Sequence, residues 1–135
     1  MSFTKLFIHC TFSTKNRENL LIEKYEKMVH SYIKKIVEKY NCKTLAINNV
    51  WDHMHILINL HPSISISELM KNIKWLSSKF INENHLSYGR FSRWEWYGCF
   101  SCSEDKLQNV INYIINQKEH HKKSRRDDTV YSVGF

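Results

Sequence analysis

The strongest constraint on the fold is the order in which two kinds of apolar pattern follow one another along the chain. Four short runs are rich in β-branched and aromatic side chains and predict strands: residues 3–12, 43–50, 53–60 and 93–103. Residues 20–40, and a segment that begins after Ser65, repeat apolar side chains every three or four positions, which predicts amphipathic helices. The resulting βαββαβ order is typical of a ferredoxin-like (RRM-like) α+β sandwich, with two helices on one face of an antiparallel sheet and the other face open for a ligand.

Residues with capping chemistry mark where the expected helices begin and end. Asn41 is the expected stop of the first helix. Ser65 and Glu68 form a capping box, so a second helix begins there. After the last strand, Ser103 and the two acidic residues that follow it open a third helix that runs to about Lys122. The sequence therefore predicts a ferredoxin-like sandwich with an added C-terminal helix.

Composition favours one soluble domain that binds a polyanion. The 135 residues contain three glycines, one proline and no linker or repeat, so we expect a single domain over residues 1–135. Twenty Lys and Arg against 13 Asp and Glu give a formal charge of +7, which favours nucleic acid as the partner. No apolar run approaches the ~20 residues of a membrane span and no secretion signal is evident, which predicts a cytoplasmic protein that does not enter a membrane.

The four cysteines do not suggest a disulfide framework, because they are few and unevenly spaced. Cys99 and Cys102 lie in a predicted strand, where residues three apart point to opposite faces. We therefore do not expect these two cysteines to share a metal ion, and a cytoplasmic location would keep them reduced.

The predicted strand at residues 53–60 carries the first candidate site. Its alternation puts two histidines on one face, together with Leu57 and Asn59, opposite the apolar face: Met54, Ile56, Ile58 and Leu60. Imidazoles two residues apart on one strand face can offer nitrogens to a single divalent cation, which makes His53 and His55 candidate metal ligands. Two half-buried histidines bonded to nearby backbone are the alternative, and the commoner one for an isolated pair.

The expected C-terminal helix presents a polar stripe beside an apolar one. The polar stripe consists of Tyr113, Gln117, His120 and His121, and the apolar stripe of Leu107, Val110, Ile111 and Ile114. The Tyr113 hydroxyl is thus expected at the boundary between core and solvent, where it can reach a substrate. One turn later, the Gln117 carbonyl can serve as a third ligand to a hard cation. Ordinary packing of the tyrosine and a solvated polar face are the alternatives.

Four segments, in order and spacing, resemble the single-tyrosine HUH transposases of small bacterial insertion sequences, of the transposase A type. They are FSTKNR at 12–17, DHMHIL at 52–57, YGCFSCS at 97–103 and YIINQKEHH at 113–121. The resemblance implies a ferredoxin-like fold and a Mg²⁺ or Mn²⁺ ion held by His53, His55 and Gln117. It also implies that Tyr113 attacks a DNA phosphodiester to give a 5′-phosphotyrosine and a free 3′-OH.

The same resemblance implies the partners and the setting of the protein. Members of that family act on single-stranded DNA beside imperfect hairpins. They work as homodimers, often with the catalytic helix of each subunit completing the site of the other. The implied location is the cytoplasm of a bacterium or archaeon, in association with the nucleoid.

Phosphate contacts require basic side chains outside the candidate site. The main candidates are Lys15, Arg17, Arg93, Lys118 and Lys122. Further candidates lie on the second helix, in the turn after it and near the end of the chain: Lys71, Lys74, Lys79, Arg90, Lys123, Arg125 and Arg126. The aromatic residues that are expected either to stack on unpaired bases or to pack in a core or dimer interface are Trp51, Trp94, Trp96 and Tyr97.

Three other functions remain open on the sequence. A non-catalytic ferredoxin-like nucleic-acid-binding module would stack bases on aromatic residues of its sheet. A metal-dependent hydrolase would keep His53 and His55 but would not need Tyr113. A domesticated relative that processes repeated hairpins in a host genome would share every catalytic residue with a transposase.

Overall fold

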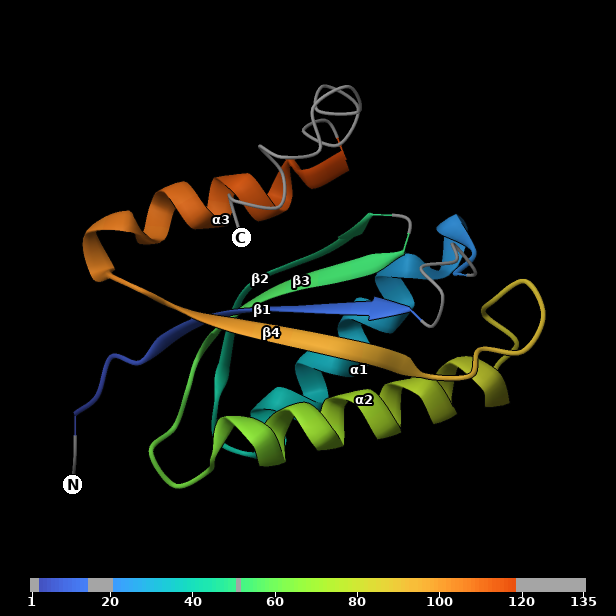
Figure 1. Ribbon diagram of the computed structural model, residues 1–135, viewed down its shortest axis with the longest axis horizontal. Helices are drawn as coiled ribbons and strands as arrows, with labels where there is room; N and C mark the ends of the chain where they lie inside the picture. The colour runs from blue at the N-terminus through green and yellow to red at the C-terminus, as the bar shows by residue number, and fades with distance from the viewer. Residues whose placement is uncertain (1–2, 15–20, 51, 119–135) are drawn as a thin grey trace.

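The computed structural model describes residues 3–14, 21–50 and 52–118. Within them, strands form one antiparallel sheet in the order β2-β3-β1-β4, with β1 in its centre beside β3 (Figure 1). The strands are β1 (Phe7–Thr14), β2 (Lys43–Val50), β3 (His53–Asn59) and β4 (Trp94–Cys102). This strand order and the βαββαβ succession confirm the ferredoxin-like fold.

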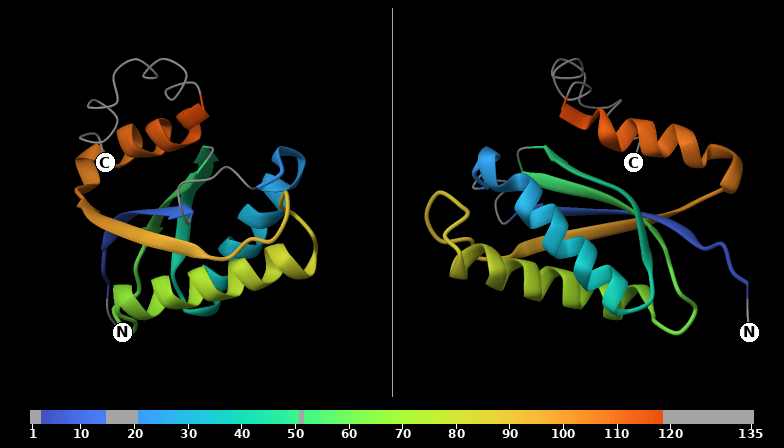
Figure 2. Two further views of the ribbon diagram at one scale, coloured as in Figure 1. Left: turned by 45° about the vertical axis from the view of Figure 1, so that its right-hand side comes forward. Right: turned by 180° about the vertical axis from the view of Figure 1, so that it is seen from behind.

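The helices lie on both faces of the sheet (Figures 1 and 2). Helices α1 (Glu26–Lys39) and α2 (Ile66–Glu83) pack side by side on one face, whereas α3 (Leu107–Ile115) crosses the other. The 3₁₀ turns η2 (Glu23–Tyr25) and η3 (Glu104–Lys106) precede α1 and α3. The face that the sequence leaves open for a ligand is therefore partly covered by α3. No helix in the described ranges is both long and apolar enough to cross a membrane.

Strand β3 has a core on each side, as its alternation predicts. Met54, Ile56 and Ile58 point into the large core under α1 and α2. Leu57 points the other way, into a smaller cluster with residues of β2 and α3. Because both faces are covered, six of the seven residues of β3 are buried.

The predicted boundaries hold for the middle strands and shift elsewhere. β2 spans the predicted residues and β3 ends one residue early. β1 begins at Phe7 rather than at residue 3, because its ladder with β3 ends where Phe7 faces Asn59. The first helix begins at Glu26 rather than at residue 20, since Leu21 instead pairs with Ser87 and buries its side chain there.

The capping residues act as predicted in α1 and α2 but not in α3. Asn41 takes a left-handed backbone conformation with φ 64° at the end of α1, and the Ser65 hydroxyl accepts a 3.1 Å hydrogen bond from the Glu68 amide. Ser103 makes no side-chain capping bond. The predicted continuous helix to Lys122 is wrong in part: α3 ends at Ile115, Asn116 leaves helical geometry, and residues 117–118 are helical again. Residues 119–122 lie outside the described ranges.

Candidate active site

The candidate site lies between the sheet and α3, where β1 and β3 meet. In the antiparallel register Ser13 faces His53, Thr11 faces His55 and His9 faces Leu57. Alternate residues of the two strands therefore share the face that α3 covers. This places the side chains of His9 and His55 beneath the helix that carries Tyr113.

Three imidazoles are packed together there. The ring centroids of His53 and His55 are 5.1 Å apart, and those of His9 and His55 are 5.2 Å apart. His9 Nε2 lies 3.0 Å from His55 Nδ1, in a buried hydrogen bond. The structure thus brings the two predicted histidines together and adds His9. Sequence reasoning missed His9, and its signal was the polar alternation His9, Thr11, Ser13 on the central strand.

Burial keeps the inner histidines neutral. It lowers the pKa of His9 from 6.5 to about 4. Burial, followed by the adjacent imidazoles of His53 and His9, holds the pKa of His55 well below 6.5. The Asp52 carboxylate lies 2.6 Å from His53 Nδ1. A carboxylate or a second imidazole on Nδ1 fixes ring orientation and directs Nε2 toward a ligand, as is usual around histidines that bind metals.

Tyr113 lies over this cluster. Its ring centroid is 6.1 Å from that of His55 and 6.5 Å from that of His9, with the rings nearly perpendicular. Burial raises the pKa of the half-buried Tyr113 phenol, and the nearby Gln117 side chain opposes that rise. The phenol is therefore protonated at neutral pH, and it must lose its proton to act as a nucleophile.

The burial of Gln117 is compatible with its expected role as the third ligand of a metal ion. Its side chain is fully buried, yet neither amide atom makes a hydrogen bond of standard geometry with the described residues. A buried amide in that state gains from a ligand that satisfies it. No group of three His, Cys, Asp or Glu side chains in the described part of the chain can hold a metal. A metal at His53 and His55 would therefore need a further ligand of another type.

The predicted phosphate-binding residues are placed unequally. Lys15, Arg17 and Lys122 lie outside the described residues, as do Trp51, His120 and His121. Arg93 is exposed and lines a pocket of about 820 Å³ between α2 and the start of β4. Other basic residues of this pocket are Lys71, Lys74, Lys79 and Arg90. Lys118 instead pairs with Glu26.

Three aromatic residues line the same basic pocket, and two of them, Trp75 and Tyr97, lie beside lysines. Lys74 Nζ lies 5.4 Å from the ring centroid of Tyr97, and Lys79 Nζ lies 5.2 Å from that of Trp75. Trp75 is 62% exposed and was not singled out from the sequence. Trp94, in contrast to Trp75, is buried in the core and donates through Nε1 to Ser77 Oγ at 2.9 Å. Of the two roles expected for Trp94, base stacking or core packing, the structure therefore shows core packing.

The two cysteines that are close in sequence do not contact each other in the structure. Cys99 faces Cys10 across β1 and β4, and their sulfur atoms are 3.0 Å apart. Cys102 instead donates to the Ser103 carbonyl. Cys99 and Cys102 thus lie in separate surroundings, in agreement with their expected opposite directions on the strand.

The fold and site together define a class of protein: a ferredoxin-like domain whose sheet carries adjacent histidines beneath a helix-borne tyrosine. The comparison of sequences narrows that class to one family. The chain belongs to the IS200-like transposases, whose family profile matches residues 2–117. This agrees with the resemblance found in the sequence.

The sequence identity to individual curated relatives is low. The chain is 29% identical over 75 residues to the transposases for insertion sequence element IS200 of Salmonella typhimurium LT2 and of Salmonella typhi. These matches cover 56% of this chain and 49% of each relative, so the chain spans about half the length of the curated relatives it matches.

Two solved structures share the fold. One is of a transposase candidate from Deinococcus radiodurans R1, with a TM-score of 0.64 and 20% identity, over 87% of this chain and 94% of that one. The other is a REP-associated tyrosine transposase bound to a REP hairpin, with a TM-score of 0.63 and 18% identity, over 90% of this chain and 72% of that one.

Proposed function

We propose that this protein is a DNA transposase that cleaves and rejoins single-stranded DNA through a covalent bond to Tyr113. The observation that carries the proposal is the packing of the Tyr113 ring against the imidazoles of His55 and His9. A tyrosine that served packing alone would not need buried polar groups beside it, since unsatisfied polar groups are costly to bury.

In this reaction the scissile phosphoryl group of the DNA is transferred from the 3′-oxygen to Tyr113. The Tyr113 oxygen attacks the scissile phosphorus, the bond from phosphorus to the 3′-oxygen breaks, and a 5′-phosphotyrosine and a free 3′-OH result. Ionising a phenol of pKa near 10 at pH 7 costs about 4 kcal/mol. Burial raises the Tyr113 pKa further. A nearby base or a water molecule takes the phenolic proton as the bond to phosphorus forms.

His53, His55 and Gln117 would hold the Mg²⁺ or Mn²⁺ ion. When bound, such an ion would polarise the scissile phosphate and stabilise the charge that develops on it. Two imidazoles and an amide oxygen without a thiolate make a poor zinc set. Asp52 contacts Nδ1 of the His53 ring and His9 contacts Nδ1 of the His55 ring, and these contacts would keep the two ligand rings in place.

A covalent intermediate suits a strand-transfer enzyme. Attack by water would release the energy of the phosphodiester, whereas an aryl phosphate keeps the bond exchangeable, so that a later 3′-OH can rejoin the strand. No nucleoside triphosphate is then required, and the sequence contains no G-x-x-x-x-G-K-[ST] loop that would bind one.

The proposed substrate is single-stranded DNA that carries imperfect hairpins, bound by a homodimer. The net charge of +7 and the basic pocket around Arg93 support a nucleic-acid partner. The similarly folded REP-associated tyrosine transposase is bound to a REP hairpin in its solved structure.

The test is covalent capture. The protein is incubated with Mg²⁺ or Mn²⁺ and with single-stranded oligonucleotides from the two DNA ends that flank its own gene, and is then run on a denaturing gel. We expect a shifted band for the wild type and none for Tyr113→Phe, because phenylalanine has no nucleophilic oxygen. Tyr88→Phe is the matched control, since Tyr88 is 63% exposed and distant in sequence. His55→Ala should lose metal-dependent cleavage and keep hairpin binding. An adduct that persists in Tyr113→Phe would disprove the proposal.

A further inference from the structure

Helix α3 carries Tyr113, but its apolar contact with the rest of the fold is small. Its buried side chains, Val110 and Ile114, cluster with Ala46 and Leu57. Helices α1 and α2, in contrast, share the large core on the other face of the sheet. Because apolar contact places α3 only loosely, polar contacts at its end have a large share in fixing where Tyr113 lies.

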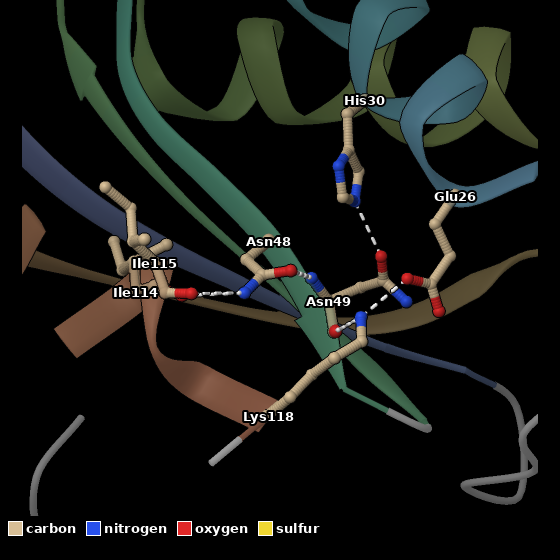
Figure 3. A network of polar contacts seen from close by, with 7 residues as sticks. All are labelled: Glu26, His30, Asn48, Asn49, Ile114, Ile115 and Lys118. Carbon is tan, nitrogen blue, oxygen red and sulfur yellow. Dashed lines mark hydrogen bonds and ion pairs between the residues drawn. The ribbon is translucent and has the colours of Figure 1, made fainter. Parts of the chain in front are cut away.

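Asn48 on β2 fastens the end of α3 (Figure 3). Its Nδ2 donates to the carbonyl oxygens of Ile114 and Ile115, each at 3.0 Å. Carbonyls in the last turn of a helix run out of partners within the helix and are satisfied from outside. The Asn48 Oδ1 accepts from the Asn49 amide at 2.9 Å. Since a backbone N–H only donates and a carbonyl only accepts, these contacts determine the orientation of the Asn48 amide.

A second set of contacts fastens the residue that follows Gln117. Lys118 Nζ donates to the Asn49 carbonyl at 3.1 Å and lies 2.5 Å from Glu26 Oε2 (Figure 3). The Asn49 side chain in turn bonds His30 Nε2 on α1 through Oδ1, at 2.6 Å. The Glu26 side chain is only 14% exposed, so this ion pair is partly shielded from water. The chain after α3 is thus tied to β2 and to α1.

We propose that this group of contacts, the α3 anchor (Glu26, His30, Asn48, Asn49 and Lys118), positions Tyr113 and Gln117 over the histidines. The inference rests on the proposed function. Asn48 holds the carbonyl of the residue next to Tyr113, and Lys118 is the residue next to Gln117. These side chains act on the reaction through the helix, as positioning residues. A misplacement of about 1 Å at a reacting group can reduce a rate roughly hundredfold.

The anchor assigns Lys118 a role that differs from the DNA contact expected from the sequence. As a phosphate contact, Lys118 would bind DNA equally well or better once the opposing Glu26 charge was removed. As part of the anchor, the same change would loosen the chain after α3 and slow the reaction. Glu26→Gln therefore separates the two roles.

Hydrogen exchange of the full-length protein tests the anchor without any DNA. Asn48→Asp keeps the shape of the side chain but removes the donor that serves the two carbonyls. We expect exchange of the α3 amides to become roughly tenfold faster. Losing the two hydrogen bonds from Asn48 should make opening of the helix about tenfold more favourable. The amides of α1 and α2 should be unchanged. Asn72→Asp is the matched control, because Asn72 makes a similar bond to the Glu68 carbonyl on α2.

Single-turnover adduct formation tests the consequence for chemistry. With the same flanking-end oligonucleotides at saturation, we expect Asn48→Asp and Glu26→Gln to slow adduct formation roughly tenfold or more, with the Kd for the oligonucleotide unchanged. Exchanging the charges, with Glu26→Lys and Lys118→Glu together, should recover only part of the lost rate, because a glutamate at position 118 cannot donate to the Asn49 carbonyl. Glu104→Gln is the control, since it removes a different ion pair, with Lys5, before α3 begins.

The outcomes separate this inference from the function on which it rests. A normal rate in both Asn48→Asp and Glu26→Gln, beside an active wild type, would overturn the anchor. So would weaker DNA binding in Lys118→Ala with an unchanged rate in Glu26→Gln, which would assign Lys118 to DNA. If the wild type forms no adduct, the proposed function fails, and the exchange of α3 in Asn48→Asp alone decides whether the anchor holds the helix.

Discussion

The two faces of the sheet are built on different principles. On the α1 and α2 face, apolar side chains from all four strands and two long helices form the large core. On the α3 face, a small apolar cluster borders buried histidines, Tyr113 and Gln117. The comparison indicates that one face supplies most of the stability, and that the other accepts buried polar groups because the first can offset their cost.

The largest effect on stability is expected on the α1 and α2 face. Trp94→Ala removes a buried ring that packs against Phe12 and Phe91 and donates to Ser77. Large-to-small changes of this kind cost about 3–5 kcal/mol. Denaturant unfolding should show this loss, while adduct formation at low temperature stays close to normal. A loss of adduct formation in a folded Trp94→Ala protein would contradict the division between the faces.

Acid should destabilise the protein through the α3 face. Because the folded-state pKa of His9 is about 4 and the unfolded value is 6.5, the unfolded chain binds a proton that the folded chain does not in that window. The free energy of unfolding should therefore fall as the pH drops from 6.5 to 4, by about 3 kcal/mol from His9. The lowered pKa of His55 adds in the same direction. Chemical denaturation at several pH values measures the slope, which should be shallower in His9→Phe.

A charge change beside the ligand rings should alter metal dependence more than folding. Asp52→Asn removes the negative charge from the partner of His53 Nδ1. Loss of such a partner typically weakens metal affinity ten- to hundredfold. We expect the Mg²⁺ or Mn²⁺ concentration for half-maximal adduct formation to rise by that factor. Asp105→Asn, in the exposed η3 turn, is the control and should leave this midpoint unchanged.

The smallest effect is expected at the surface. Lys5 and Glu104 form a 2.7 Å ion pair, but both side chains are largely open to solvent. Such pairs contribute at most about 0.5–1 kcal/mol. Lys5→Ala should change the unfolding free energy by no more than that and leave adduct formation intact. A larger loss would mean that the approach to β1 contributes to the α3 face.

Local pattern predicted most of the fold, because strand alternation and helix capping depend on neighbouring residues. The bounds of β2 and the start of α2 at Ser65 are examples. The pairing of His9 with His55, and of Cys10 with Cys99, depends on strand register, which one sequence read along its length does not contain. The end of α3 at Ile115 was missed for a similar reason: Asn48, which lies 67 residues before Ile115, caps the helix by donating to the Ile115 carbonyl.

The candidate site was predicted in its residue types and only in part in its surroundings. His53, His55 and Tyr113 were expected together, and the structure brings them together. Asp52 lies beside His53 in both sequence and space, but nothing in its spacing marks it as a partner of the ring. The metal-binding roles of His53 and His55 and the catalytic role of Tyr113 remain predictions that the capture experiment tests.

The double burial of β3 has a consequence for how this protein can diverge. In an ordinary surface strand every second residue faces water and tolerates exchange, but six of the seven residues of β3 have neighbours on all sides. A library that samples every substitution along the chain should find its least permissive stretch there, with no alternation between tolerant and intolerant positions. Lineages descended from this chain would then keep its two histidines partly because the crowded strand around them leaves few neutral mutational paths.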